Sequence, residues 1–406
     1  MKSISTALAA QPLPFGISKI LSLLDEIAQG TLTLTTPQGL SIQIGHGNGP
    51  VADLQINRWS ALRKIFRSGD IGLAECYRDG LIQTKDVTAL LRFAIQNQKA
   101  LDSAINGHRF IQATYWLKHL LRTNTRKNSR KNISAHYDLG NNFYHLWLDP
   151  SMTYSSAYFA GDHTLDLTTA QENKYQRMLD LTGAQPGDRL LEIGCGWGGF
   201  AEYAARRGMH VHGVTLSTEQ LNYAQTRIDK AGLSKQVQLE LRDYRDLDDK
   251  YDHIVSIEML EAVGERYWKT YFEQLRSLLK PDGKAAIQVI TIKDEKFDEY
   301  RRRSDFIQQY IFPGGMLPSV EVLNEVTMES ALNISKLDQF GRDYAETLRR
   351  WRRAFEQQKN RIQSLGFDQE FIKLWRFYLC YCEAGFDENE IDVVHLQLVN
   401  SDGAAG

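Results

Sequence analysis

Three glycines in the segment LEIGCGWGG (191–199) have a spacing that can serve chemistry. Gly194, Gly196 and Gly199 form a G-x-G-x-x-G pattern. Their missing side chains permit a tight turn from a strand into a helix and let a ligand approach the backbone closely. The same pattern marks the turn of dinucleotide-binding proteins. The loop therefore predicts a ligand site, and the residues around it decide which ligand fits.

The surroundings of the loop argue against a flavin or nicotinamide oxidoreductase. A dinucleotide site has an acid about 20 residues further on, at the end of the second strand, for the ribose hydroxyl. Residues 214–217 read VTLS and contain no acid, and Glu219 follows in a predicted helix. Glu192 instead lies two residues before the first glycine. A carboxylate there suits a cationic ligand better than a pyrophosphate.

The pattern E-x-G-x-G-x-G resembles the first motif of the S-adenosylmethionine-dependent methyltransferases. A set of ordered segments then resembles one group of them, the cyclopropane fatty-acyl-phospholipid synthase family, over roughly residues 133–400. The segments are HYDLGNNFYHLWLDPSMTYSSAYF (136–159), LLEIGCGWGGFA (190–201), GVTLSTEQLNYA (213–224), IEMLEAVGERYW (257–268), DFIQQYIFPGGMLPS (305–319) and FGRDYAETLRRW (340–351).

The resemblance implies a specific reaction. In this family the methyl group of S-adenosylmethionine is added to a cis double bond of an unsaturated phospholipid acyl chain. The resulting carbocation must be sheltered from water and can be stabilised by aromatic faces. A base then removes a proton from the new methyl group, and the ring closes. In the family this base is thought to be a bound bicarbonate ion.

The resemblance also implies which residues bind the cofactor. We add Glu192 and Asp243 to this set because of their places beside the glycine loop and the adenine. We expect Asp243 to pair with the adenine amino group and Tyr244 to flank the adenine ring. The predicted cofactor-binding residues are Tyr154, Ser155, Glu192, Gly194, Gly196, Thr215, Leu216, Gln220, Asp243 and Tyr244.

The family binds its bicarbonate ion with four side chains, those of a cysteine, a glutamate, a histidine and a tyrosine. We call this set the anion nest. Glu261 matches the glutamate and Tyr344 the tyrosine, whereas Ser156 and Gln288 replace the cysteine and the histidine. Both replacements stay neutral and can form hydrogen bonds, so the nest can still hold an anion. Cys382 lies where the family has a cysteine once proposed as catalytic. Alkene methylation needs no thiol nucleophile, so we expect Cys382 to line the acyl site.

An alternative product keeps the same cofactor and lipid. If the base takes the proton from another carbon, the acyl chain becomes methylene- or methyl-branched without ring closure. Ser156 and Gln288 are the positions at which we expect such a switch to lie. A cofactor-free lipid-binding protein is a further alternative, against which the intact glycine loop argues.

Apolar runs separated by helical segments predict a doubly wound, Rossmann-like α/β sheet of the class I methyltransferase type with helical insertions. Its ligand should lie at the carboxyl ends of the strands. Long helical stretches are expected beyond Pro281. The predicted strands are 188–194, 210–216, 237–243, 251–258, 284–292 and 393–399.

The remaining chain predicts three parts. Residues 1–115 contain a hairpin pattern at 30–45 and helical periodicity that is interrupted at residues 68–70, which indicates a small α+β domain. This region resembles the N-terminal domain of the full-length bacterial members of the family, and the resemblance implies lipid binding, membrane binding or dimerisation. Residues 116–132 form a basic linker with no acid among six cations from Lys118 to Lys131. This linker is either solvated or contacts anionic lipid headgroups. Residues 133–406 form the catalytic domain.

Composition sets the outer limits. The 406 residues, of which 42% are hydrophobic, suggest two domains with ample core. A net charge of −2 gives no global attraction for nucleic acid. Four cysteines are too few for a disulfide framework, and no metal site is expected.

We expect a cytoplasmic protein associated peripherally with the inner face of the membrane, and the resemblance implies a homodimer. The segment RRWRRAF (349–355) predicts a solvated helix face or an amphipathic surface near a membrane.

Overall fold

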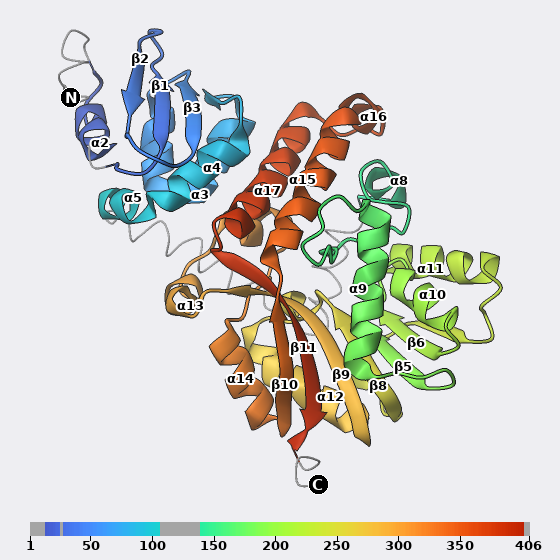
Figure 1. Cartoon of the computed structure of the whole chain (residues 1–406). Helices are drawn as coiled ribbons and strands as arrows, with labels where there is room; N and C mark the ends of the chain where they lie inside the picture. Colours follow the sequence, from blue (N-terminus) through green and yellow to red (C-terminus); the bar gives the residue numbers. More distant parts are fainter. Residues whose placement is uncertain (1–12, 25–26, 106–138, 402–406) are drawn as a thin grey trace.

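The computed structural model describes residues 13–24, 27–105 and 139–401 (Figure 1). The basic segment 118–132 and the predicted domain boundaries at 115/116 and 132/133 lie outside these residues, so the division into three parts stays a prediction. The described chain contains a four-stranded sheet near its N-terminus and a seven-stranded sheet in the remainder.

The seven-stranded sheet has the order β10-β11-β9-β8-β5-β6-β7. The strands from β9 to β7 are mutually parallel, and β11 runs antiparallel to both of its neighbours. The predicted α/β fold is therefore the one observed. The strands are β5 (Arg189–Ile193), β6 (His210–Thr215), β7 (Val237–Leu241), β8 (Tyr251–Ile257), β9 (Leu279–Ile292), β10 (Leu332–Gln339) and β11 (Ile391–Asn400).

Helices cover both faces of this sheet, which explains why its strands are nearly continuous apolar runs. Successive residues point to opposite faces, so Leu190 and Val255 pack toward α9 and α10, while Leu191 and Ile254 pack toward α12. The helices that follow α8 (Asn141–Tyr144) are α9 (Leu167–Thr182), α10 (Gly199–Ala205), α11 (Thr218–Lys230), α12 (Trp268–Leu278), α13 (Asp294–Tyr300), α14 (Val320–Glu329), α15 (Gly341–Gln357), α16 (Lys359–Ser364) and α17 (Gln369–Asp387).

The small sheet has the order β2-β1-β3-β4 and confirms the predicted hairpin, because β1 pairs antiparallel with β2. The predicted interruption of helical periodicity at residues 68–70 corresponds to a kink at Gly69, whose φ of 58° lies outside the helical region. Its elements are α2 (Ile17–Leu23), β1 (Thr31–Thr35), β2 (Ser41–Ile44), β3 (Val51–Ile56), α3 (Ser60–Arg78), β4 (Ile82–Gln83), α4 (Val87–Gln96) and α5 (Gln98–Ile105).

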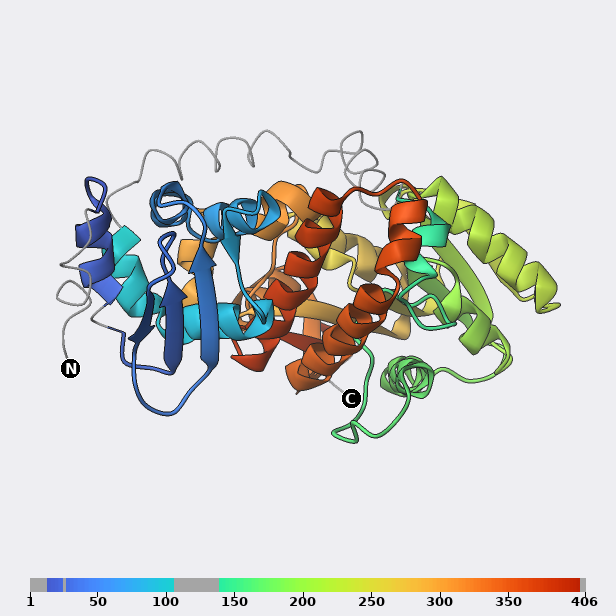
Figure 2. The ribbon, with the colours of Figure 1, turned by 90° about the horizontal axis from the view of Figure 1, so that it is seen from above.

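Helices α15 and α17 lie between the two sheets (Figures 1 and 2). Helix α17 contacts α15 on one side and α3 and α4 on another. Arg92 and Gln96 of α4 donate to Glu388, at the end of α17, at 2.6 and 2.8 Å. Tyr381 of α17 donates to Asp70 of α3 at 3.0 Å. The N-terminal part thus shares a hydrophobic cluster with these helices.

The segment RRWRRAF packs mostly inside the protein, and Arg353 is its one exposed residue. Trp351 is fully buried. Arg349 and Arg352 pair with Glu383 of α17 at 3.2 and 2.7 Å. Glu383 also accepts from Thr88 of α4 at 3.3 Å. Sequence reasoning missed this acid because it lies on another helix.

Strand β10 was not expected from the sequence, which predicted helical stretches between the strands at 284–292 and 393–399. Its residues LNISKLDQ alternate imperfectly, and most of them stay partly exposed because the strand lies at the edge of the sheet. Edge strands carry a weak hydrophobic pattern for this reason. Among the described helices, none has both the length and the apolar character needed to cross a membrane.

We expect Glu383→Ala to lower the free energy of unfolding by about 3 kcal/mol, because it removes the buried carboxylate that Arg349 and Arg352 share. Urea denaturation followed by circular dichroism measures this change. Glu329→Ala is the matched control, since Glu329 pairs with Lys269 through side chains that are 60% and 54% exposed. Losing such a surface pair costs below about 1 kcal/mol. Equal effects of the two substitutions would contradict the assignment of Glu383 to the buried cluster.

Candidate functional site

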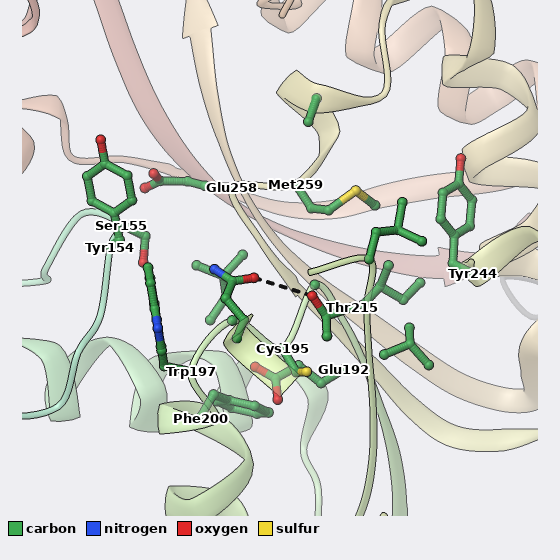
Figure 3. Close-up of a pocket in the computed structure, with 18 of the residues that line it drawn as sticks. Tyr154, Ser155, Glu192, Cys195, Trp197, Phe200, Thr215, Tyr244, Glu258 and Met259 are labelled. Atoms are coloured by element: carbon green, nitrogen blue, oxygen red, sulfur yellow. Dashed lines mark hydrogen bonds between the residues drawn. The ribbon is translucent and has the colours of Figure 1, made fainter. Parts of the chain in front are cut away.

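A pocket opens at the carboxyl ends of β5, β6, β7 and β8 (Figure 3). The chain leaves β5 toward β6 on one side, and β8 pairs with β5 on the other. This reversal of strand order creates the crevice in which open α/β sheets bind ligands. The pocket lies where the sequence predicted a ligand.

The pocket wall contains every residue that the sequence predicted for cofactor binding. These are Tyr154, Ser155, Glu192, Gly194, Gly196, Thr215, Leu216, Gln220, Asp243 and Tyr244.

The glycine loop brings bare backbone to the pocket. Gly194 and Gly196 have φ values of 84° and 50°, in the left-handed region that favours glycine. A Cβ on Gly194 would lie 3.1 Å from the Met259 side chain, whereas a Cβ on Gly196 would meet no atom within 4 Å. The space beside Gly196 is therefore open to a ligand.

Glu192 places a buried carboxyl group at the base of the pocket. Its side chain is buried, and its Oε2 has no hydrogen-bond partner among the described residues. Burial raises the pKa of Glu192 to about 8, and the nearby Lys174 acts in the opposite direction. An unpartnered carboxyl of this kind is suited to receive a cation.

Lys174 of α9 is a site residue that sequence reasoning missed. It is fully buried, and its Nζ donates to Ser155 Oγ at 2.6 Å. Burial lowers the pKa of Lys174, while the carboxylates of Glu258 and Glu192 favour its charged form. The available signal was its place in α9, because Lys174 lies four residues after Ala170 and four before Met178, both on the buried face.

The other end of the pocket contains polar groups suited to an adenosine. Thr215 Oγ1 donates to Gln220 Oε1 at 3.3 Å (Figure 3). Tyr244 lies at the end of the pocket opposite Glu258 (Figure 3). The Asp243 carboxylate accepts from Arg245 Nε and Nη2 at 2.8 and 2.6 Å, and its pairing with an adenine amino group stays a prediction. Arg245 also lines the pocket.

Glu258, at the end of β8, is the acid around which the predicted anion nest gathers. Its Oε1 accepts from the Ser156 backbone N–H at 2.8 Å and from Gln288 Nε2 at 2.7 Å. Its Oε2 accepts from Tyr344 Oη at 2.7 Å. Burial raises the pKa of Glu258, which these donors and the Lys174 cation oppose. Three of the predicted nest residues therefore meet, but at Glu258.

Glu261, predicted as the nest glutamate, lies elsewhere. Its Oε1 accepts from the Ile290 backbone N–H at 2.6 Å, and it does not line the pocket. The reason is the backbone at the end of β8, where Glu258 has a φ of 49°. The chain then enters a 3₁₀ turn (Leu260–Ala262) that carries Glu261 to the edge of β9. Burial raises the pKa of Glu261 to about 8, and the charge of Glu258 adds to the effect.

His395 of β11 orients Gln288 and was also missed. Its Nε2 lies 2.8 Å from Gln288 Oε1. The Gln288 amide nitrogen faces two acceptors, Glu258 Oε1 and the Ser156 carbonyl, so the Gln288 oxygen must face the histidine. Burial lowers the pKa of His395 to about 3. His395 is therefore neutral with its proton on Nε2. Its position inside an apolar strand was the only sequence signal.

An aromatic cluster borders the Glu258 end of the pocket. Tyr154 lies 5.4 Å from both Trp147 and Trp351, measured between ring centroids, and its hydroxyl lies 2.8 Å from that of Tyr378. Cys382 packs against the same cluster but does not line the cofactor pocket. Burial raises the pKa of the Cys382 thiol, so it stays protonated.

The described residues contain no group of three or more His, Cys, Asp or Glu side chains arranged to hold a metal ion. The charged residues that line the pocket are Glu192, Arg242, Asp243, Arg245 and Glu258, and Lys174 contacts the pocket residue Ser155 through its buried Nζ.

Comparison with known proteins shows what this site is similar to. A family profile described as "Mycolic acid cyclopropane synthetase" matches residues 124–396. The chain is 40% identical to the tuberculostearic acid methyltransferase UfaA1 of Mycobacterium tuberculosis, over 85% of this chain and 83% of that protein. It is 33% identical to the cyclopropane-fatty-acyl-phospholipid synthase of Escherichia coli, over 86% of this chain and 87% of that protein.

A solved structure of a relative supports the nature of the ligand. Mycolic acid cyclopropane synthase CmaA1, solved in complex with SAH and CTAB, matches with a TM-score of 0.62 and 31% identity. The match covers 66% of this chain and 97% of that one. The fold is therefore that of the class I S-adenosylmethionine-dependent methyltransferases, and S-adenosylmethionine is the supported co-substrate.

We expect the affinity for S-adenosylmethionine to fall as the pH is lowered from 8.5 to 6.5. With a pKa of about 8, Glu192 of the free protein is increasingly protonated below pH 8, whereas a bound cation favours the ionised carboxylate. Binding must then release a proton, which weakens the affinity by up to roughly tenfold per pH unit. Isothermal titration calorimetry at several pH values measures this slope.

Glu192→Gln should flatten this pH profile and weaken binding at pH 8.5. Glu172→Gln is the matched control, since Glu172 is an exposed residue of the same charge type on α9, and its profile should follow the wild type. A Glu192→Gln profile as steep as that of the wild type would assign the titration to another group and contradict the expectation.

Proposed function

The chain belongs to the mycolic acid cyclopropane synthetase family, and from this premise we propose that it converts cis double bonds of unsaturated phospholipid acyl chains into cyclopropane rings. It is an S-adenosylmethionine-dependent methyltransferase acting on lipid acyl chains. The observation that carries the finer proposal is the pocket itself. One wall of the pocket has the residues expected for the cofactor. The other end of the pocket holds the Glu258 carboxylate, which accepts hydrogen bonds from Ser156, Gln288 and Tyr344.

The residues present fit the co-substrate. The unpartnered Oε2 of Glu192 can receive its positive charge, and the open space beside Gly196 admits its amino-acid part. Thr215, Gln220 and Tyr244 lie where its adenosine would extend. When bound, S-adenosylmethionine supplies an electrophilic methyl group.

An alkene has no proton that a base could remove to make it nucleophilic, so the protein must act by positioning and by excluding water. The aromatic cluster around Tyr154 supplies an apolar wall beside the Glu258 end of the pocket. Aromatic faces stabilise a carbocation through their negative electrostatic potential. The proton acceptor for ring closure then belongs in the neighbouring nest. Bicarbonate, the base that the resemblance implies, would compete with Glu258 for the donors of Ser156, Gln288 and Tyr344.

A second candidate product is a methylene- or methyl-branched acyl chain. It is favoured by the 40% identity to a relative named tuberculostearic acid methyltransferase. The methyl transfer and the carbocation are the same, but the proton is lost without ring closure. A methyl-branched end product needs a separate reductant, whereas a methylene product does not.

The proposal includes the setting of the reaction. The substrate is a phospholipid in a bilayer, the protein associates peripherally with its cytoplasmic face, and the chain acts as a homodimer. Residues 1–115 serve lipid binding, membrane binding or dimerisation, the linker 116–132 follows, and residues 133–406 form the catalytic domain. These statements rest on the family resemblance and on the basic composition of residues 118–132.

Incubation with cis-unsaturated phospholipid vesicles and methyl-labelled S-adenosylmethionine tests the proposal. We expect the label to enter the lipid and NMR of the product to show cyclopropane ring protons. Vesicles of the saturated phospholipid with the same headgroup are the control and should take up no label, because they offer no π electrons. Vinylic or methyl protons in the product would instead establish the branched-chain alternative, and no label in any lipid would overturn the proposal.

A further inference from the structure

The Glu258 carboxylate already occupies the position that an anion would take in the predicted nest. Both of its oxygens are engaged by donors from three separate parts of the chain: the Ser156 loop, Gln288 of β9 and Tyr344 of α15. A bicarbonate ion presents the same kind of two-oxygen acceptor. Since each donor is within 2.8 Å of Glu258, the side chain and the ion cannot share the nest.

The hydrogen bonds favour the ionised form of Glu258 and oppose burial, which raises its pKa. The Ser156 backbone N–H can only donate, and so can the Gln288 amide nitrogen. The orientation of that amide is fixed from behind by His395. Tyr344 completes the set on the other oxygen, and the buried cation of Lys174 adds an attractive charge. Every contact thus favours a carboxylate that accepts.

The position of Glu258 connects the nest to the reaction. Its side chain lines the same pocket as the cofactor residues and points toward Tyr154 and Ser155 (Figure 3). Its φ of 49° is a conformation that costs energy for a residue with a side chain. Strained backbone at a pocket wall indicates that the surrounding structure holds the residue there for a purpose.

We propose that the Glu258 carboxylate is the base that removes the proton after methyl transfer, in place of bicarbonate. This inference rests on the proposed function. The alkene π pair forms the bond to the transferred methyl carbon, and the C–S bond electrons stay on sulfur, which leaves a carbocation on the acyl chain. A Glu258 oxygen then accepts a proton from the new methyl group, whose C–H electrons close the ring. The proton passes to solvent, so no oxidant or reductant is required.

The experiment compares methyl-label transfer to cis-unsaturated phospholipid vesicles in carbonate-free buffer under argon and with added bicarbonate. The wild type should keep the same rate in both conditions. Glu258→Gln keeps the shape of the side chain but cannot accept a proton, so the rate should fall roughly 100-fold, with no recovery in bicarbonate. Glu258→Gly empties the nest at a φ that suits glycine. Its rate should fall similarly without bicarbonate and rise at least about tenfold with it, as an added anion takes the place of the missing base.

Calorimetric binding of S-adenosylmethionine supplies the second readout and should change less than about threefold in both variants. Ala331→Gly is the matched control, because Ala331 also has a positive φ, 55°, but lies between α14 and β10, away from the pocket. It should keep the wild-type rate in both buffers.

A wild type that loses its activity without bicarbonate would overturn the inference, as would a Glu258→Gln variant with the wild-type rate. If Glu258→Gly binds no S-adenosylmethionine, the rates of Glu258→Gln in the two buffers decide between the outcomes. Failure of the proposed function has a different signature: the wild type then binds S-adenosylmethionine but labels no lipid in either buffer.

Discussion

The charge of a buried carboxylate must be compensated by hydrogen-bond donors or by a positive charge. The two glutamates of the site meet this requirement in different ways. Glu258 meets it within the protein, with donors on both oxygens and Lys174 nearby. Glu192 meets it only in part, because one of its oxygens has no partner among the described residues. The first is thereby fixed in place, whereas the second is left to be completed by a ligand. One buried lysine contributes to both.

The sheet topology places these two carboxylates at opposite sides of one crevice. Glu192 belongs to β5 and Glu258 follows β8, and these strands are neighbours whose carboxyl ends open into the pocket. The strands supply rigid positions, while the loop after Met152 and helix α15 bring the aromatic and hydroxyl groups over them. The carboxylates therefore come from the strands, whereas the apolar surroundings come from segments outside the sheet.

The sequence predicted the parts that depend on local pattern. Five parallel strands, the first hairpin, the break at Gly69 and the glycine loop could all be derived from apolar runs and turn residues. Contacts between distant segments could not. The spacing in EMLE offered two glutamates, and only the left-handed backbone at Glu258 decides which of them faces the pocket. Lys174 and His395 read as isolated polar residues in buried elements until their partners are placed beside them. Strand β10 lacks a pattern because it lies at the sheet edge.

The shared packing of α17 has a consequence for how such chains can be rearranged in evolution. Its outer face is apolar and aromatic, because Phe377 and Tyr381 pack into the same hydrophobic cluster as residues of the N-terminal sheet. Solved relatives that align over 97% of their own length cover only 66% of this chain. A lineage that loses the N-terminal part must therefore replace that face with polar side chains or cover it with another partner. We therefore expect the composition of this one helix to differ between the two-sheet and the one-sheet forms of the enzyme.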